Sequence, residues 1–157
     1  MSDGRVSIQT LLERHPRLAL DSNVLIYLLE RDEARAELVA CLVDAIGTGQ
    51  VEGVLGTVGL AEVLVGPARW GDAASFEMAA STVRNLGFLL QPLDPGTAED
   101  AAWIRGTTGA DLPDAMHLAS ARAAGATAFI TNDRRIRARP GLEVFYLDDL
   151  TLEQPLP

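Results

Sequence analysis

Four acidic side chains, far apart in the chain, are the residues whose type and placement predict chemistry: Asp21, Glu62, Asp114 and Asp133. Two carboxylates about 4 Å apart repel by about 4 kcal/mol at an effective dielectric constant of 20. Acids that converge therefore share a proton or bind a cation. Hard oxygen ligands suit Mg²⁺ or Mn²⁺. If the chain brings these four together, they predict a divalent metal site.

The predicted strands and helices that carry the four acids favour their convergence. Asp21 and Asp133 each lie just beyond a short apolar run, 17–20 and 128–131, that reads as a buried strand. Glu62 lies one turn into the helix that follows the strand-like run 51–57, and Asp114 lies in the first turn of an Ala-rich helix. In open α/β sheets, ligands bind outside the carboxyl ends of the strands. We therefore expect the four acids at one sheet edge.

Strand-like and helical segments alternate along the whole chain. Strands are predicted at 17–20, 51–57, 88–93, 128–131 and 142–147. Helices are predicted at 23–29, 32–46, 72–85, 95–105 and 112–124, and a further helix follows the strand 51–57 and ends at Gly66-Pro67. This order predicts an α/β domain with a short central, mainly parallel sheet and helices on both faces. We expect one domain over 1–157, with a core at 17–150 and an N-terminal arm or short helix at 1–16.

Composition limits the function further. Apolar residues make up 48% and charged residues 22%, as in a globular protein. Cys41 is the only cysteine, which excludes a disulfide framework and a multi-cysteine zinc site. No run approaches the ~20 apolar residues that span a bilayer, and the N-terminus lacks an apolar signal core, so we expect a cytoplasmic protein without membrane contact.

The net charge of −9 argues at first against a nucleic-acid partner. All thirteen basic residues are arginine, however, and four of them, Arg134, Arg135, Arg137 and Arg139, directly follow Asp133. Arginine presents a planar fork that fits phosphate oxygens. A GC-rich genome explains the absence of lysine, whereas the local run beside an acid suggests a phosphate contact.

Four motifs carry a family resemblance: LALDSNVLI (18–26), LAEVL (60–64), LPDAMHLASA (112–121) and FITND (129–133). Together, and in this order, they resemble the motifs of PIN-domain nucleases, and within them the VapC-type toxins of bacterial toxin–antitoxin pairs. The resemblance covers roughly 17–150. It implies a three-layer α/β/α fold, Mg²⁺- or Mn²⁺-dependent hydrolysis of RNA, a cognate antitoxin and a homodimer.

The resemblance also implies roles for single residues. Asp21, Asp114 and Asp133 would be metal ligands, and Glu62 a ligand or the group that orients the attacking water. Ser22 would contact phosphate or a metal-bound water. Thr131 and Asn132 would orient Asp133, with Asn132 beside the substrate, and Arg134, Arg135 and Arg137 would hold flanking phosphates.

Structural roles compete with several of these functions. Asp21 suits a turn or helix N-cap, and Asp111 suits the N-cap of the helix that carries Asp114 at its third position. His117 is expected to be a partly buried helix residue, because His15 is the only other histidine. We expect Trp70, Trp103 and Phe76 to serve in packing.

Other functions lack sequence support. Phosphotransfer folds of the receiver or haloacid-dehalogenase type need a lysine near the acidic site, and a P-loop needs Gly-Lys; the chain has no lysine. The alternative that remains open is a catalytically quiet interaction or RNA-binding module with the same fold.

Overall fold

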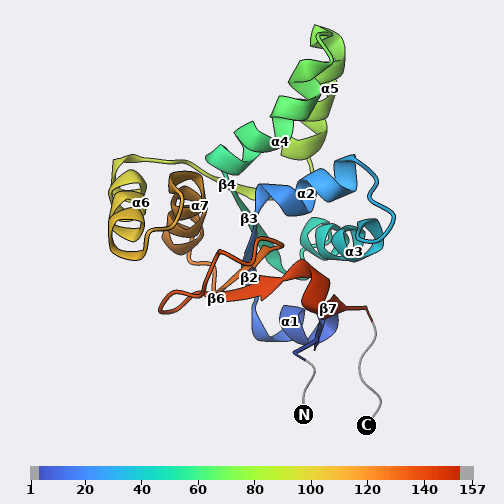
Figure 1. The fold of residues 1–157 in the computed structure, drawn as a ribbon. Helices are drawn as coiled ribbons and strands as arrows, with labels where there is room; N and C mark the ends of the chain where they lie inside the picture. The colour runs from blue at the N-terminus through green and yellow to red at the C-terminus, as the bar shows by residue number, and fades with distance from the viewer. Residues whose placement is uncertain (1–3, 153–157) are drawn as a thin grey trace.

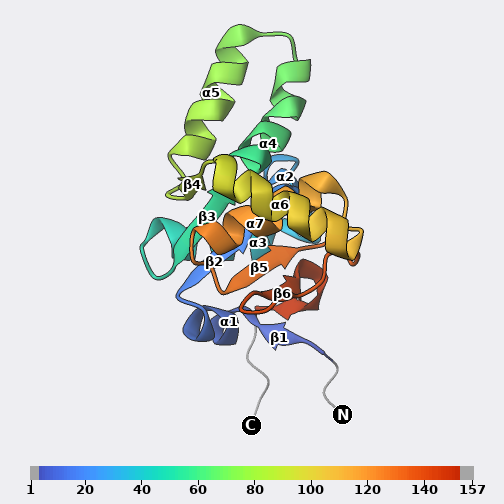
Figure 2. The same cartoon turned by 90° about the vertical axis from the view of Figure 1, so that its left-hand side faces the viewer.

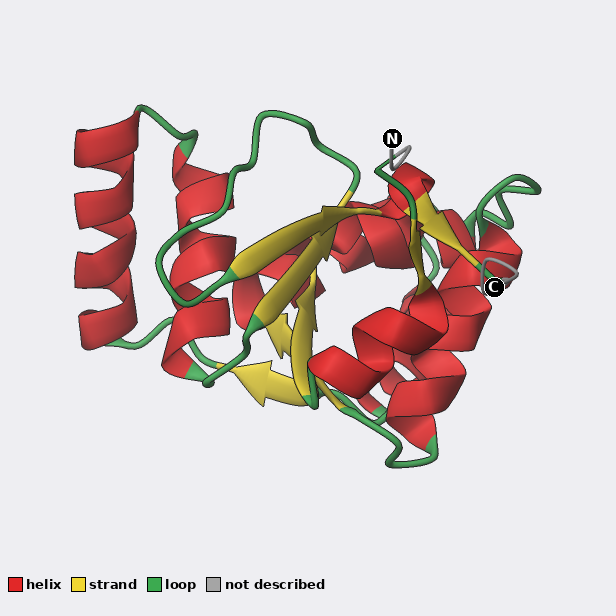
Figure 3. Ribbon diagram, turned by 90° about the horizontal axis from the view of Figure 1, so that it is seen from below, coloured by secondary structure: helices red, strands yellow, loops and turns green. Residues whose placement is uncertain are grey.

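The computed structural model describes residues 4–152 and is built around a parallel sheet of five strands in the order β4-β3-β2-β5-β6. The strands are β2 (Arg17–Leu20), β3 (Glu52–Gly56), β4 (Leu89–Gln91), β5 (Ala128–Thr131) and β6 (Glu143–Tyr146). The sheet is flanked by helices on both sides (Figures 1 and 3). This confirms the expected three-layer α/β/α architecture, and all the pairings in the sheet are parallel.

Alternation along the central strands creates two separate cores. In β2, Leu18 and Leu20 pack in one apolar cluster and Ala19 in the other, because successive side chains of a strand point to opposite faces. Helices α2 (Ser22–Leu29) and α3 (Ala36–Gly47) cover the first cluster, and α6 (Pro95–Thr108) and α7 (Leu112–Ala123) cover the second. The continuous apolar character of the strands thus reflects burial on both faces.

Helices α4 (Thr57–Arg69) and α5 (Ala73–Arg84) pack against each other and project from the body as a helical hairpin (Figure 2). The prediction that Gly66-Pro67 ends the first of these helices was wrong. Pro67 cannot donate a backbone hydrogen bond, yet the helix continues to Arg69. The helix ends with i→i−3 hydrogen bonds from the N–H groups of Trp70 and Gly71 to the carbonyls of Pro67 and Ala68. Because Pro67 lies near the end of the helix, the helix tolerates the one hydrogen bond that proline cannot donate.

The N-terminal segment is part of the packed structure. Strand β1 (Val6–Ser7) pairs in parallel with β7 (Leu150–Thr151), which follows the 3-10 turn η1 (Leu147–Asp149). Helix α1 (Ile8–Arg14) buries Ile8, Leu11 and Leu12 in the same core as α2 and α3. The segment is therefore a short helix, as predicted, but it lies against the core rather than outside it.

Two aromatic predictions were wrong. Trp70 and Trp103 are 63% and 67% exposed, so neither fills the core, while Phe76 is half-buried. The cores are instead filled by aliphatic side chains together with Phe88, Phe129 and Phe145. No helix within residues 4–152 is both long and apolar enough to cross a membrane.

Candidate active site

Asp21 occupies the N-cap position of α2 without capping that helix. Its backbone is extended, and its N–H is bonded to the Ile130 carbonyl at 2.9 Å, which fixes it against β5. The carboxylate is 4% exposed and makes no side-chain cap bond. It accepts hydrogen bonds from the hydroxyls of Thr131, at 2.7 Å, and Ser22, at 3.3 Å. A buried carboxylate that is held by two hydroxyls and has no close guanidinium is stabilised by a nearby positive charge.

The Thr131 hydroxyl connects two of the predicted acids. It donates to Asp21 Oδ2 and accepts a bond from the backbone N–H of Asp133 at 3.0 Å. Thr131 is fully buried at the carboxyl end of β5. Because one hydroxyl makes both contacts, the position of the Asp133 backbone is coupled to that of the Asp21 carboxylate. The expected hydrogen bond between Thr131 and Asp133 is therefore present, and it is made to the backbone N–H of Asp133.

Glu62 meets His117 across the interface of α4 and α7. Glu62 Oε1 lies 2.5 Å from His117 Nε2, and the same nitrogen lies 3.7 Å from Asp21 Oδ1. Ser22 Oγ is 3.3 Å from both Asp21 Oδ1 and Glu62 Oε1, so its single proton serves one carboxylate at a time. His117 is 4% exposed and belongs to the site. The sequence interpretation of His117 as a helix residue only was therefore incomplete.

The electrostatics of this pair follow from the contact. The hydrogen bond with His117 lowers the pKa of Glu62, against the opposing effect of burial. Burial alone would lower the pKa of His117, but the bond to Glu62 and the negative charges of Asp21 and Glu62 outweigh it and raise the pKa. The raised pKa shifts His117 toward its protonated form, in which the imidazole would place positive charge beside the two acids.

Small residues make the contact between α4 and α7 possible. A Cβ at Gly59 would lie 2.8 Å from Leu55 Cδ1 and 3.3 Å from His117 Cε1. A Cβ at Gly56 would lie 3.1 Å from Ser120 Cβ. Gly59 lets α4 approach α7 this closely, and Gly56 lets the end of β3 approach Ser120 of α7, because both positions lack a side chain. Glycine at 56 and 59 thus lets Glu62 and His117 reach each other.

Asp114 faces the other acids from the first turn of α7. Burial raises its pKa, and the negative charges of Asp21 and Asp133 raise it further. These interactions place Asp114 within electrostatic range of two of its predicted partners. Asp21 and Asp133 thus lie beyond the carboxyl ends of β2 and β5, Glu62 lies in the helix after β3, and Asp114 interacts electrostatically with Asp21 and Asp133 from α7.

The four acids do not form a ready-made coordination shell. Among residues 4–152, no group of three or more His, Cys, Asp or Glu side chains is arranged to hold a metal ion. Two of the acids are instead engaged by basic groups, Glu62 by His117 and Asp133 by Arg135. The donor chemistry suits Mg²⁺ or Mn²⁺, since all four predicted ligands are carboxylates, but the observed side-chain arrangement is not that of a filled site.

Arg135 is the arginine of the basic run that reaches the acids. Its guanidinium contacts both Asp133 oxygens at 2.8 to 3.3 Å, and this contact lowers the pKa of Asp133. Arg134 points elsewhere: it forms a bidentate pair with Asp149 at 2.8 and 2.9 Å and lies over the Tyr146 ring. Arg134 is therefore paired within its own chain, and its expected phosphate contact stays a prediction.

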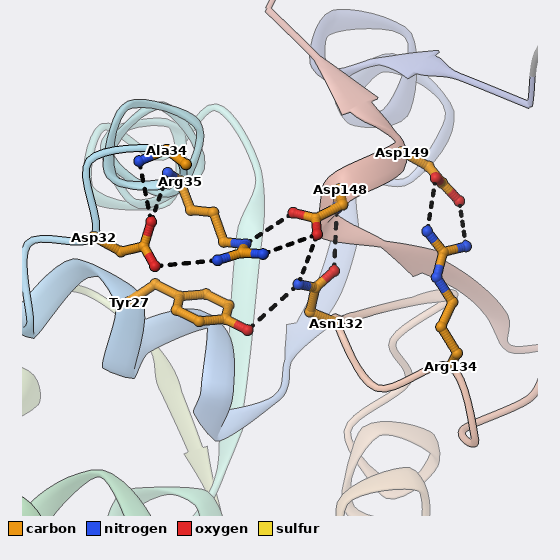
Figure 4. A network of polar contacts seen from close by, with 8 residues as sticks. All are labelled: Tyr27, Asp32, Ala34, Arg35, Asn132, Arg134, Asp148 and Asp149. Carbon is orange, nitrogen blue, oxygen red and sulfur yellow. Dashed lines mark hydrogen bonds and ion pairs between the residues drawn. The ribbon is translucent and has the colours of Figure 1, made fainter.

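Asn132 also differs from its predicted role. Its amide donates to Tyr27 Oη and Asp148 Oδ2, and its carbonyl oxygen accepts from the Asp148 N–H (Figure 4). The prediction that Asn132 orients Asp133 was wrong, because its side chain turns toward η1. It joins a network in which Arg35 forms a bidentate contact with Asp148 and also bonds Asp32. This network ties the segment between α2 and α3 to the loop after β5.

A comparison with acids that cap other helices distinguishes structural acids from the acids of the candidate site. Asp72 caps α5 through the N–H groups of Ala74 and Ser75, and Asp94 caps α6 through Thr97. Asp21 and Asp111 hold the same helix position but make no cap bond. The expected capping role of Asp111 was therefore wrong; its carboxylate instead faces Arg105 and Arg135 at 3.9 and 3.5 Å.

Comparisons with solved structures agree with this fold. A toxin–antitoxin complex from Klebsiella pneumoniae contains a chain with 25% identity and a TM-score of 0.57, aligned over 80% of this chain and 94% of that one. VapBC2 from Rickettsia felis, bound to a promoter DNA fragment, matches with 13% identity, a TM-score of 0.62 and coverage of 83% and 98%. FitAcB from Neisseria gonorrhoeae matches with 22% identity, a TM-score of 0.57 and coverage of 83% and 97%. Among curated proteins, none matches this sequence.

The sequence profile of the PIN domain family matches residues 18–142, which include all four acids, β3, β4, β5 and all of β2 but its first residue. The extent of this match and the position of the acids at the strand ends lead to one conclusion: the chain belongs to the PIN domain family.

Proposed function

We propose that this protein is a divalent-metal-dependent endoribonuclease and the toxin of a type II toxin–antitoxin pair. PIN domains are typically nucleases, and the family match supports hydrolysis of phosphodiester bonds. The observation that carries the proposal is Asp21: a carboxylate 4% exposed at a helix N-cap position that caps nothing and lies among other acids. A structural acid at that position would bond to its helix, as Asp72 does.

Asp21, Asp114 and Asp133 are proposed as ligands of Mg²⁺ or Mn²⁺, and Glu62 as a ligand or as the residue that orients the attacking water. A bound ion would polarise the scissile phosphate and supply an activated water. Burial and the negative charges of Asp21 and Asp133 raise the pKa of Asp114, and a cation would relieve both effects, which supports this assignment. Glu62 and Asp133 are only partly buried, so both have room to leave His117 and Arg135.

The protein's own groups have distinct tasks in this proposal. Thr131 and Ser22 hold the Asp21 carboxylate in place by hydrogen bonds. His117 holds Glu62 by a hydrogen bond. Arg135 is the proposed phosphate contact, because its guanidinium is 76% exposed and already lies beside Asp133. RNA is the proposed substrate on the strength of the resemblance to VapC-type toxins.

The proposed protein partner is a cognate antitoxin. A groove of about 320 Å³ between α2 and α4 is lined by Ile26, Leu29, Val65 and Trp70 and reaches Glu62. Leu29, Val65 and Trp70 are 41%, 47% and 63% exposed, an apolar strip typical of a protein-binding surface. The toxin–antitoxin complexes among the structural neighbours support this partner. A homodimer is proposed from the same resemblance.

Cleavage of single-stranded RNA tests the proposal. We expect purified protein to cut RNA with Mg²⁺ or Mn²⁺, to stop with EDTA, and to lose at least about 100-fold in rate as Asp21→Asn or Asp114→Asn. Asp94→Asn, at a true helix cap, is the matched control and is expected to retain activity. Cutting that survives EDTA and both substitutions would exclude the metal nuclease. If RNA is never cut but is bound, the quiet RNA-binding module is the better description.

A further inference from the structure

A second cavity adjoins the carboxylate cluster and shares Asp114 with it. This cavity, of about 380 Å³, lies between the end of α6, the start of α7 and the loop 135–139. Its volume is within the range of pockets that hold small organic ligands. Asp114 lines the cavity and also interacts with Asp21 and Asp133. A ligand in the cavity would therefore lie directly beside the proposed reaction centre.

The floor of this cavity is apolar. Ile104, Leu118 and Ile136 line it and are 1%, 3% and 2% exposed, so the surface that they present is fixed by the second core. Such a floor favours a flat, weakly hydrated group over a fully solvated one. The apolar floor does not by itself identify the ligand, but it argues against a cavity that binds only a small ion.

Polar groups at the edge of the cavity have unused hydrogen-bonding capacity. Arg139 Nε is buried and has no hydrogen-bond partner within residues 4–152, although the Arg139 backbone is fixed by two bonds to Leu142. Buried donors are normally paired. Asp111 faces Arg105 and Arg135 only at 3.9 and 3.5 Å, with no hydrogen bond to either, so its carboxylate oxygens remain free to accept.

These features narrow the class of ligand. The charged lining of the cavity is mixed, because Asp111 and Asp114 line it together with Arg135, Arg137 and Arg139, so no net charge of a ligand is selected. A group that is planar, uncharged, and equipped with both N–H donors and carbonyl or ring-nitrogen acceptors fits the apolar floor, the carboxylate acceptors and the guanidinium donors of this lining together. Nucleobases have this chemistry, and single-stranded RNA is read by unstacking bases onto apolar surfaces and guanidinium planes.

We infer that this cavity is a nucleobase subsite, which holds a base next to the scissile phosphate and gives the nuclease a preference for sequence at that position. The inference rests on the proposed nuclease function for its link to cleavage. Asp111 and Arg139 read the edge of the base, and Arg135 lies at the entrance between this cavity and Asp133. The site acids and the subsite thus meet at Asp114.

Binding of the four ribonucleosides, followed through the methyl signals of Ile104, Leu118 and Ile136 by NMR, tests the cavity without any cleavage. We expect at least one nucleoside to shift these signals at millimolar concentration. The variants Ala110→Phe and Ala138→Phe each add a ring at the cavity lining and are expected to abolish the shift. Ala98→Phe, an exposed α6 position outside the cavity, is the matched control and is expected to keep it.

An RNA substrate with an abasic site moved stepwise around the cut tests the link to cleavage. Removal of one particular base is expected to lower kcat/KM by about tenfold or more in the wild type, and to have little effect in Ala138→Phe or Arg139→Met. Cleavage equally tolerant of every abasic position overturns the subsite and leaves the nuclease standing. If no RNA is cleaved at all, the proposed nuclease function is overturned. The nucleoside titration then still shows whether the cavity binds a nucleobase. Pocket methyl signals that no nucleoside shifts overturn the inference outright.

Discussion

His117 Nε2 lies 2.5 Å from Glu62 Oε1 and 3.7 Å from Asp21 Oδ1, so one buried imidazole stands between two acids from different helices. Close packing of α4 on α7 at Gly59 makes this arrangement possible. In the arrangement observed, the positive charge between the acids comes from the protein itself. A divalent ion would compete with His117 for Glu62 and with Arg135 for Asp133.

Replacement of His117 by glutamine is expected to destabilise the metal-free protein in a pH-dependent way. The raised pKa of His117 contributes stability that is full below its ordinary value of 6.5 and lost as pH rises. The lowered pKa of Glu62 contributes stability above its ordinary value of 4.5 that is lost as pH falls. The loss in His117→Gln should thus be largest, about 1 to 2 kcal/mol, between these values. Thermal unfolding from pH 4 to 9 measures it, and a loss independent of pH would contradict the ion pair.

Replacement of Asp114 by asparagine is expected to stabilise the metal-free protein at neutral pH. An acid whose pKa is raised on folding favours the folded state below its ordinary pKa and costs stability as pH rises. The variant should therefore melt about 2 to 4 °C higher at pH 7, with no gain near pH 3. Asp94→Asn is the comparison, since the pKa of Asp94 is lowered by its cap bonds. A lower melting temperature for Asp114→Asn at pH 7 would refute the clustering of acids.

Substitution at Thr131 separates its hydroxyl from its shape. Thr131→Val keeps the volume but removes the bond to Asp21 and the acceptor for the Asp133 N–H. We expect RNA cleavage or metal affinity to fall about 10- to 100-fold, as is usual when a group that orients a ligand is lost. Thr131→Ser restores the hydroxyl and is expected to recover most of the activity. Equal activity of the valine and serine variants would show that the bridge has no orienting role.

The network around Asp148 is expected to fix the segment between α2 and α3. Arg35→Ala removes the bidentate contact with Asp148 and the bond to Asp32 shown in Figure 4. Because these side chains are partly exposed, the expected cost is about 1 kcal/mol. Hydrogen exchange should accelerate in 30–36 and around Asn132, and Arg84→Ala, which removes an exposed pair with Glu77, is the control. Unchanged exchange in both segments would mean that the network does not couple them.

Much of this site was predictable because two simple rules govern it. Apolar runs 17–20 and 128–131 had to be strands, and parallel strands present their carboxyl ends at one edge, which placed Asp21 and Asp133 correctly. Asp114, in the first turn of its helix, was chosen over Asp111 because of the family resemblance, and Glu62 was chosen on the same ground. Strand-end placement therefore located two of the acids, and the resemblance supplied the other two.

Side-chain partners were not predictable, because they depend on how helices pack. His117 follows Asp114 by one helical turn between apolar neighbours, a sign of an inward-facing position, but its contact with Glu62 depends on the absence of side chains at Gly56 and Gly59. Asn132 turned to Asp148 because η1 folds back beside β5, a contact between distant segments. Neither the His117–Glu62 contact nor the Asn132–Asp148 contact can be predicted from the local sequence.

Binding of Mn²⁺ to the metal-free protein, followed by electron paramagnetic resonance, tests the central claim most directly, because it asks whether the gathered acids hold a cation. We expect the wild type to bind one or two ions, Asp21→Asn to bind at least about tenfold more weakly, and Asp72→Asn, at a helix cap, to bind like the wild type. Equal Mn²⁺ binding by wild type and Asp21→Asn, or no binding by the wild type, would contradict the account.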